Sequence, residues 1–168
     1  MSSTIDNGDK VLDSRDIIRR IEELEGEKEL VSDQEESARE LYEETLRERI
    51  NDGTDNEESA DCDRLKEELE HAVERSEAWD HSDEAGELKA LKLVADQCEG
   101  YGDWEHGEPL IHDRHFEAYA QEFAEDCGMV KDQDTWPNRC IDWTQAAEEL
   151  KQDYMEVDFD GQAYWMRA

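Results

Sequence analysis

The excess of carboxylates is the feature that most constrains what this chain can fold into. The 168 residues include 50 Asp and Glu against 18 Lys and Arg, a net charge of −32 at pH 7, and 36% of them are hydrophobic. Charge of this density opposes compaction, and a low apolar content leaves little to offset it. The chain can therefore fold only where its apolar residues are spaced to make a continuous face.

Such spacing begins at Ile17 and continues through Ile21, Leu24 and Val31, in steps close to three and four residues. This pattern is typical of a coiled-coil stripe on a helix that starts near residues 13–16. Gly26 interrupts it, at a cost of about 1 kcal/mol relative to Ala. Either the helix kinks at this glycine or two helices meet, and residues 32–35 offer a second helix start. Both alternatives stay open.

Two further amphipathic helices follow a turn-rich, acidic segment at residues 51–59, which is predicted to be a loop. The first carries Leu65, Leu69 and Trp79 on one side, and the second carries Leu88 and Leu91 on one side. Each has a narrow apolar stripe and a wide acidic back. We therefore expect a flexible N-terminus at residues 1–12 and an acidic helical hairpin or coiled-coil arm at residues 13–99.

Aromatic residues mark a different C-terminal part. The first hundred residues contain only Tyr42 and Trp79, whereas the remainder holds four of five Trp, four of five Tyr and all three Phe. Gly100 and Gly102 lie at this change, so residues 100–168 are predicted to form a compact domain.

Local signals give the elements of this domain. Residues 109–111 lead into a helix that Gly128 ends, and Asp142 caps a second helix. Asp160-Gly161 lies between two alternating segments, which is typical of a two-residue β-hairpin. The predicted class is α+β, mostly α: a helical arm followed by a small helical domain with a C-terminal hairpin.

The charge also restricts the partners. Residues 1–100 have a net charge of −20 and residues 101–168 a net charge of −12, a similar density. A surface of this sign repels nucleic acids and anionic membranes and attracts cationic proteins. Four cysteines without CxxC spacing, and an N-terminus without a signal-peptide pattern, favour a cytoplasmic protein with reduced thiols.

Chemistry at a small site finds little support in the sequence. His112 and His115 precede Cys127 and Cys140, but the paired spacing of a zinc motif is missing, so no metal is expected. Carboxylates near aromatic residues invite a catalytic interpretation, yet neither a nucleophile with its base nor a phosphate-binding loop accompanies them. We expect a protein that is not an enzyme and has no cofactor.

The acidic helix faces are the leading candidate for a binding surface. Carboxylates on neighbouring turns lie about 5 to 6 Å apart, so they can stand in for the phosphates of a nucleic acid. The candidate phosphate-mimicking residues are Glu35, Glu36, Glu43, Glu44, Glu67, Glu68, Glu70, Glu74, Glu77, Asp142, Glu148, Glu149, Asp153, Asp158 and Asp160.

Two other interpretations remain. A coiled-coil assembly protein would form a homodimer through Ile17, Ile21, Leu24 and Val31. A generic acidic protein of a high-salt organism would have the same composition, because a run of charge is usually a solvated face.

A family resemblance supports the interpretation that the acidic helix faces mimic a nucleic acid. Phe116, Tyr119, Ala120 and Gly128, followed by the run from Ile141 to Leu150 and then Asp153-Tyr154, resemble the C-terminal part of the ArdA antirestriction proteins. The similar region covers about residues 110–167, and the chain also looks like small uncharacterised phage proteins with a coiled-coil N-terminus and a similar ending. ArdA proteins are DNA mimics encoded by phages and mobile elements, and they inhibit type I restriction-modification enzymes. The family has α/β modules where this chain has its acidic arm.

The resemblance implies an inhibitor of a host DNA-binding defence complex. Its partner would be the basic DNA-binding surface of a restriction-modification enzyme or of a CRISPR-Cas complex.

Overall fold

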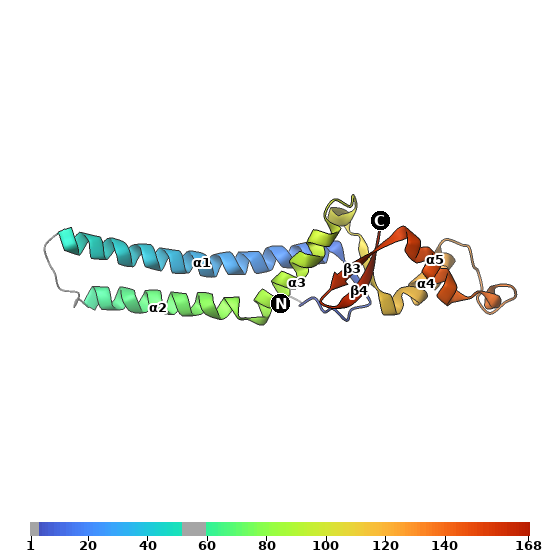
Figure 1. Ribbon diagram of the computed structural model, residues 1–168, viewed down its shortest axis with the longest axis horizontal. Helices are drawn as coiled ribbons and strands as arrows, with labels where there is room; N and C mark the ends of the chain where they lie inside the picture. Colours follow the sequence, from blue (N-terminus) through green and yellow to red (C-terminus); the bar gives the residue numbers. More distant parts are fainter. Residues whose placement is uncertain (1–3, 52–59) are drawn as a thin grey trace. The chain divides into compact units, whose positions relative to one another are not determined.

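The computed structural model describes residues 4–51 and 60–168, and the chain divides into two compact units (Figure 1). Unit 1 contains residues 1–21 and 89–168, and unit 2 contains residues 22–88. The protein is α+β and mostly helical, with a C-terminal β-hairpin, which confirms the predicted class.

Unit 2 is an antiparallel helical hairpin. Helix α1 (Ser14–Asn51) enters it from unit 1, α2 (Ala60–Asp80) returns, and α3 (Asp83–Cys98) begins in it. Lys28 Nζ lies 5.6 Å from the centre of the Trp79 ring, Arg75 donates to Gln34, and Arg49 donates to the Cys62 sulfur. Residue numbers rise on α1 as they fall on α2, which defines the antiparallel register. The loop predicted at 51–59 lies outside the described residues, except for Asn51.

Helix α1 is continuous over 38 residues, so neither a break at Gly26 nor a separate start at Ser32 occurs. A Cβ built at Gly26 would meet nothing within 4 Å, so close packing does not require this glycine. Glycine costs about 1 kcal/mol in a helix interior. This cost is small compared with the free energy gained as a long helix is extended residue by residue.

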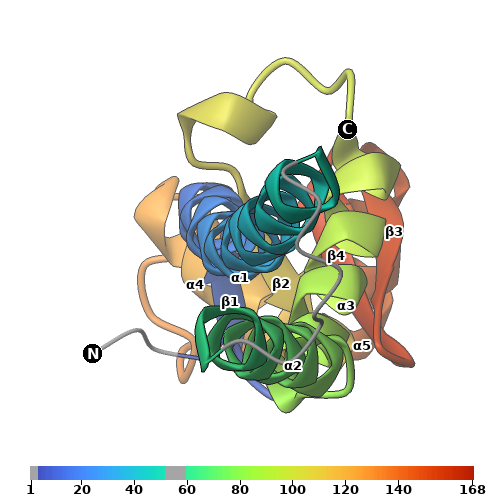
Figure 2. The same ribbon diagram turned by 90° about the vertical axis from the view of Figure 1, so that its left-hand side faces the viewer.

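Unit 1 is built on a four-stranded antiparallel sheet in the order β1-β2-β4-β3, which can be followed in Figure 2. The strands are β1 (Val11–Asp13), β2 (Pro109–His112), β3 (Tyr154–Phe159) and β4 (Gln162–Arg167). Helices α4 (Phe116–Asp126) and α5 (Trp143–Leu150) pack against each other beside it (Figure 1). Short 3₁₀ helices occur at Trp104–His106 (η1), Asp113–His115 (η2), Asn138–Cys140 (η3) and Lys151–Asp153 (η4).

Strand alternation gives this sheet two buried faces. Ile111 is fully buried in a cluster with Phe116, Ala120 and Ala147, so α4 and α5 cover one face. The other face presents the fully buried side chains of Leu110, Val157, Tyr164 and Met166. Figure 1 places the first turns of α1 and residues 89–98 of α3 on that side.

The N-terminal residues depart most from the prediction. Strand β1 begins inside the predicted flexible segment of residues 1–12, ends at Asp13 and pairs with β2. The Tyr164 hydroxyl lies 3.0 Å from the Asn7 carbonyl oxygen and 2.8 Å from that of Asp9. These contacts bring the N-terminus into unit 1, so the units divide at residues 21 and 88 and not near residue 100.

The predicted caps and hairpin are confirmed. Asp142 accepts a hydrogen bond from the Gln145 N–H at 3.1 Å, and Gly128, with φ of 69°, follows α4. In the hairpin turn Asp160 and Gly161 have φ of 49° and 78°, as a type I′ turn requires. Strands β1 and β2 are missing from the prediction because their pairing joins residues about a hundred positions apart.

Replacing Tyr164 by Phe tests the anchoring of the N-terminus. The substitution keeps the buried ring and removes the hydroxyl from the Asn7 and Asp9 carbonyl groups. We expect a loss of about 1 to 2 kcal/mol in the free energy of unfolding, measured with urea, and faster amide exchange in β1. Tyr42→Phe is the matched control, and equal effects of the two changes would contradict the anchoring role.

Asp113 makes a second link within unit 1. Its Oδ1 accepts hydrogen bonds from Lys151 Nζ and Trp165 Nε1, both at 2.8 Å, and the Lys151 ammonium lies 4.9 Å from the centre of the Trp165 ring. The bonds from Lys151 and then Trp165 hold the pKa of Asp113 below its ordinary value. The ionised carboxylate therefore stabilises the fold above its unfolded pKa of about 3.9.

Asp113→Asn should lower the free energy of unfolding at pH 7 by about 1 kcal/mol, because a charge-assisted hydrogen bond is lost. The difference from the unchanged protein should disappear as the pH falls through the lowered pKa of Asp113. Urea unfolding from pH 7 to pH 2.5 measures this. A difference that stays constant over the range would show that the charge of Asp113 has no role.

Candidate functional site: an acidic helical surface

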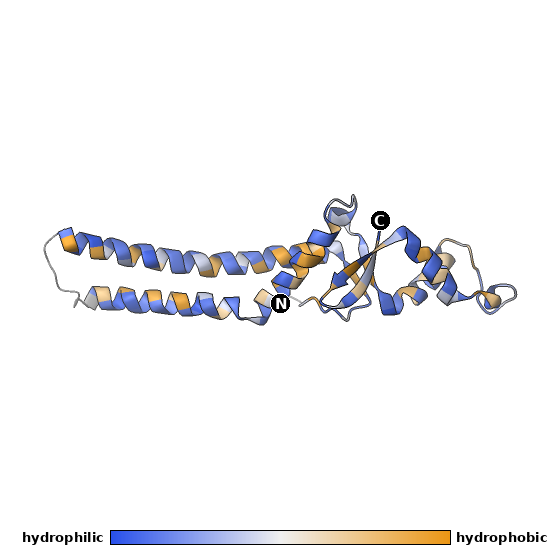
Figure 3. Cartoon of the chain, viewed as in Figure 1, coloured by the Kyte–Doolittle hydropathy of each residue, from blue (hydrophilic) through white to orange (hydrophobic). Residues whose placement is uncertain are grey.

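The acidic excess is concentrated in unit 2. Residues 22–88 contain 27 acidic and 7 basic residues, a net charge of −20 over 67 positions. The other 101 residues have a net charge of −12. The similar densities of residues 1–100 and 101–168 conceal this difference, because that division places the first 21 residues and residues 89–100 of unit 1 together with unit 2. Figure 3 shows hydrophilic residues over most of α1 and α2.

A row of exposed carboxylates follows the back of α1, which is the side away from its buried residues. The row comprises Glu25, Glu29, Glu36, Glu40 and Glu43, in steps of four, seven, four and three residues. Such steps keep all five on one helix face. Glu36 and Glu43 were predicted, and the same heptad spacing in the sequence could have identified the other three.

A second exposed row lies on the back of α2. Glu67, Glu70, Glu74 and Glu77 are all exposed, and they are separated by three or four residues. Asp63 extends the row by one turn and was not among the predicted residues. Leu65 and Ala72 are buried on the opposite side of the helix, so the four predicted glutamates project away from the apolar seam.

Basic residues of the hairpin neutralise only part of these rows. Ion pairs within one helix join Arg39 to Glu35, Arg47 to Glu43, Arg64 to Glu68 and Lys66 to Glu70, and His71 lies 3.5 Å from Glu74. In the described part of the chain, Glu36, Glu44, Glu67 and Glu77 form no ion pair. Glu35 differs from the other predicted residues because its side chain is 24% exposed.

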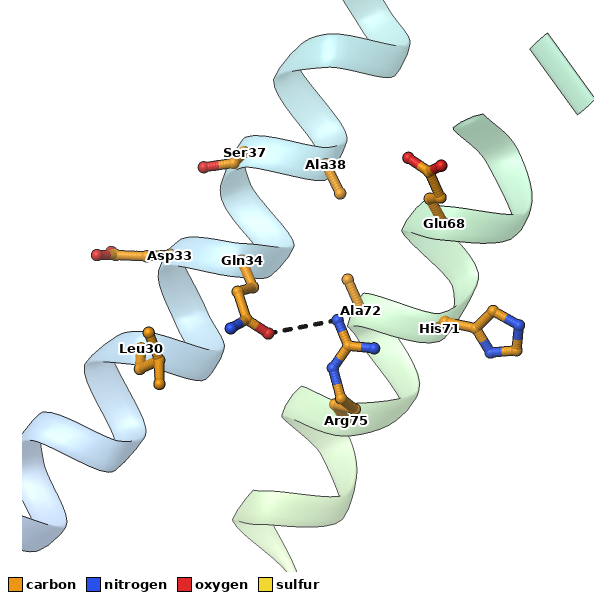
Figure 4. Close-up of a pocket in the computed structure, with 9 residues that line it drawn as sticks. All are labelled: Leu30, Asp33, Gln34, Ser37, Ala38, Glu68, His71, Ala72 and Arg75. Carbon is orange, nitrogen blue, oxygen red and sulfur yellow. Dashed lines mark hydrogen bonds between the residues drawn. The ribbon is translucent and has the colours of Figure 1, made fainter. Parts of the chain in front are cut away.

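A groove of about 530 Å³ runs along one side of the α1–α2 pair (Figure 4). Ala38 and Ala72 point toward each other across it, and Arg75 donates to Gln34 at 3.4 Å. Small side chains at the contact leave this space open. Its lining includes Asp33 and Glu68 as well as His71 and Arg75, so acidic and basic residues both border the groove.

The predicted dimer stripe is used inside the chain. Ile17 and Leu24 have no exposed surface, and Ile21 and Val31 are partly buried. Fully buried side chains are not available to a second copy without unfolding. The stripe therefore contributes to the chain's own core, and this correction removes the feature on which the homodimer prediction rested.

The six predicted carboxylates of unit 1 are exposed, and several have local structural roles. Asp142 caps α5, Glu148 pairs with Lys151 at 2.8 Å, and Asp158 accepts a hydrogen bond from the Gly161 N–H at 3.4 Å. Asp160 occupies the left-handed position of the hairpin turn. Glu149 and Asp153 make no ion pair among the residues that the structure describes.

The histidines considered for zinc lie in unit 1. Their rings are 5.9 Å apart, and His112 is buried against the Tyr164 ring, with its Nδ1 accepting the Arg114 N–H. Burial and the nearby cations lower the pKa of His115. Within residues 4–51 and 60–168, no group of three or more His, Cys, Asp or Glu side chains is arranged to hold a metal ion.

Comparison with known proteins adds no relative. The chain matches no family model, no curated protein and no solved structure. Within the described residues, no helix combines the length and the apolar character needed to cross a membrane.

The acidic rows should reduce the stability of the hairpin. Like charges three or four residues apart on a helix cost about 0.2 to 0.5 kcal/mol per pair. Glu67 faces Glu70, and Glu77 faces Glu74, so the double change Glu67→Gln and Glu77→Gln should raise the free energy of unfolding by about 0.5 to 1 kcal/mol at low salt. Urea unfolding in 1 M NaCl should remove most of the gain.

The control for this prediction is Glu68→Gln, which removes a carboxylate that pairs with Arg64. We expect no gain from it. A double variant that is less stable than the unchanged protein at low salt would show that the row is not under electrostatic strain.

Proposed function

We propose that this protein is a nonenzymatic inhibitor of a DNA-binding defence complex and that it acts as an acidic mimic of duplex DNA. Its target would be the cationic DNA-binding surface of a restriction-modification enzyme or of a CRISPR-Cas complex. The observation that carries this proposal is the concentration of outward carboxylates on the α1–α2 hairpin.

The number of acidic groups in the hairpin approaches the number of phosphates on duplex DNA of the same length. The part of α1 within unit 2, residues 22–51, is about 45 Å long at 1.5 Å per residue. Duplex DNA of this length carries about 26 phosphate charges. The described residues of unit 2 include 23 acidic side chains against 7 basic ones. The hairpin thus supplies a comparable number of anionic groups over a comparable length, and its net charge of −16 is smaller than that of the DNA.

The arrangement of the charge also suits this role. Two helices hold the rows of Glu36, Glu43, Glu67 and Glu74 on regular backbones, so few groups need ordering when a partner binds. Lys and Arg side chains of the partner would pair with these carboxylates as they pair with phosphate oxygens. The field of the hairpin would speed encounter with a cationic cleft, and salt would weaken it.

The high-salt alternative predicts acidic residues spread over the whole surface, since it concerns solubility alone. In this chain the net charge per residue of unit 2 is more than twice that of unit 1. This contrast favours a role of the charge that is specific to the hairpin over a general adaptation of the whole surface to high salt.

Two variants with equal changes of charge test the proposal. In the hairpin variant Glu29, Glu36, Glu40, Glu67 and Glu77 become Gln, and none of these exposed residues makes an ion pair in the described structure. In the unit 1 variant Glu99, Glu105, Glu122 and Glu156 become Gln and Asp126 becomes Asn, and these residues are also exposed.

The measurement is inhibition of DNA cleavage by a purified type I restriction enzyme, and inhibition of target binding by a purified CRISPR surveillance complex. The unchanged protein should inhibit at least one of them. We expect the hairpin variant to be about tenfold or more weaker and the unit 1 variant to stay near full strength. Equal inhibition by both variants, or no inhibition of either complex by the unchanged protein, would contradict the proposal.

A further inference from the structure

Unit 1 contains a cavity of about 440 Å³ that is separate from the hairpin surface. Residues 101–104, the start of β2, α4 and the ends of the β3–β4 pair surround it. Its volume lies within the range of about 300 to 1,000 Å³ that is usual for small-molecule sites. None of the residues proposed to mimic phosphate lines it.

Four of its ten lining residues are aromatic: Tyr101, Trp104, Tyr119 and Tyr154. Trp104 is 8% exposed, and the hydroxyl groups of Tyr119 and Tyr154 are 2.8 Å apart in a hydrogen bond. The Tyr154 ring meets Phe116 edge-on, with centroids 5.1 Å apart and an interplanar angle of 88°. These contacts fix the two tyrosines, while Tyr101 is 40% exposed at the cavity. A rigid aromatic wall can attract a cation through the faces of its rings.

Three charged residues, Asp103, Glu108 and Arg167, also line the cavity. The backbone of Glu108 is held by Ser14, whose N–H donates to the Glu108 carbonyl at 3.1 Å and whose Oγ accepts the Glu108 N–H at 2.9 Å. Burial raises the pKa of Glu108, Asp103 raises it further, and Arg167 opposes both. Among the side chains that line the cavity, ionised Asp103 and Glu108 against Arg167 leave an excess of one negative charge in a partly desolvated space.

We propose that this cavity binds a monovalent organic cation, a guanidinium or an alkylammonium group, between its aromatic wall and the carboxylates of Asp103 and Glu108. A guanidinium fits best, because its plane stacks on aromatic rings while its fork of N–H groups donates to a carboxylate. Arg167 can neutralise one of the two side-chain carboxylates, and a bound cation would neutralise the other. The inference does not depend on the proposed function.

The guanidinium could belong to a free small molecule or to an arginine side chain of a polypeptide. Butylguanidinium represents the free cation, and Nα-acetyl-arginine N-methylamide represents an arginine within a chain. Butylurea is the neutral control of nearly the same shape. Calorimetric titration of the full-length protein with each probe separates charge recognition from apolar binding.

The protein attracts cations over its whole surface, so site-specific variants are needed. Glu108→Gln removes a carboxylate from the cavity, and Glu105→Gln removes an exposed carboxylate of η1 that does not line it. Both change the net charge equally. Tyr101→Ala removes an exposed part of the wall, and circular dichroism verifies that each variant is folded.

Butylguanidinium should bind one site, and butylurea should bind at least tenfold more weakly. Glu108→Gln should reduce the affinity about tenfold, Tyr101→Ala about threefold, and Glu105→Gln less than twofold. Affinity should fall as the pH decreases through the raised pKa of Glu108, at a higher pH than for an ordinary glutamate near 4.3. Asp103 and Arg167 are the other charged side chains that line the cavity.

Tight binding of the blocked arginine would identify a polypeptide side chain as the occupant, and binding of butylguanidinium alone would identify a free molecule. Equal binding of butylurea, equal effects of Glu108→Gln and Glu105→Gln, or no saturable binding of either cation would overturn the proposal. The DNA-competition assays do not use this cavity, so each proposal can fail without the other.

Discussion

Repulsion between carboxylates, opposed by a thin apolar seam, is the constraint on which the hairpin depends. In unit 2 the buried side chains include Leu24, Leu65, Ala72 and Leu88. Each buried leucine contributes about 1.5 to 3 kcal/mol, whereas each like-charge pair on a helix costs a few tenths of a kcal/mol. A few apolar residues can therefore hold together a surface with many acidic ones. Ion pairs such as Arg39–Glu35 reduce the repulsion without covering the outward rows.

Unit 1 is stabilised in a different way from the hairpin, because side chains are buried on both faces of its small sheet. Ile111 faces the cluster formed with Phe116 and α5, and its neighbour Leu110 faces the opposite side. Closure of the first face leaves Tyr119 and Tyr154 beside Glu108, where the aromatic cavity forms. The same packing that stabilises this unit therefore creates a pocket with a chemical character unlike that of the acidic hairpin.

Local signals in the sequence predicted most helices and the hairpin, because a cap such as Asp142 and a turn such as Asp160-Gly161 act over a few residues. Strand β1 was not predicted, because its three residues are stabilised by pairing with β2, which lies about a hundred residues later in the sequence. Periodicity identified the seam at Ile17 and Leu24, but it could not decide whether a helix of the same chain or a second copy covers it. The outward rows were found in part, since acidic residues are too frequent for single positions to stand out. The cavity beside Trp104 could not be predicted, because it joins segments from five places in the sequence.

The central claim is that the hairpin occupies a site built for duplex DNA. The most direct measurement is competition at equilibrium: a fluorescently labelled duplex is bound to a purified restriction or CRISPR complex, and the protein is titrated in at several salt concentrations. The account predicts that the duplex is displaced, and that the logarithm of the protein's affinity falls linearly with the logarithm of salt concentration, as it does for DNA itself. Duplex that remains bound in a three-component complex with the protein, or an affinity independent of salt, would contradict it.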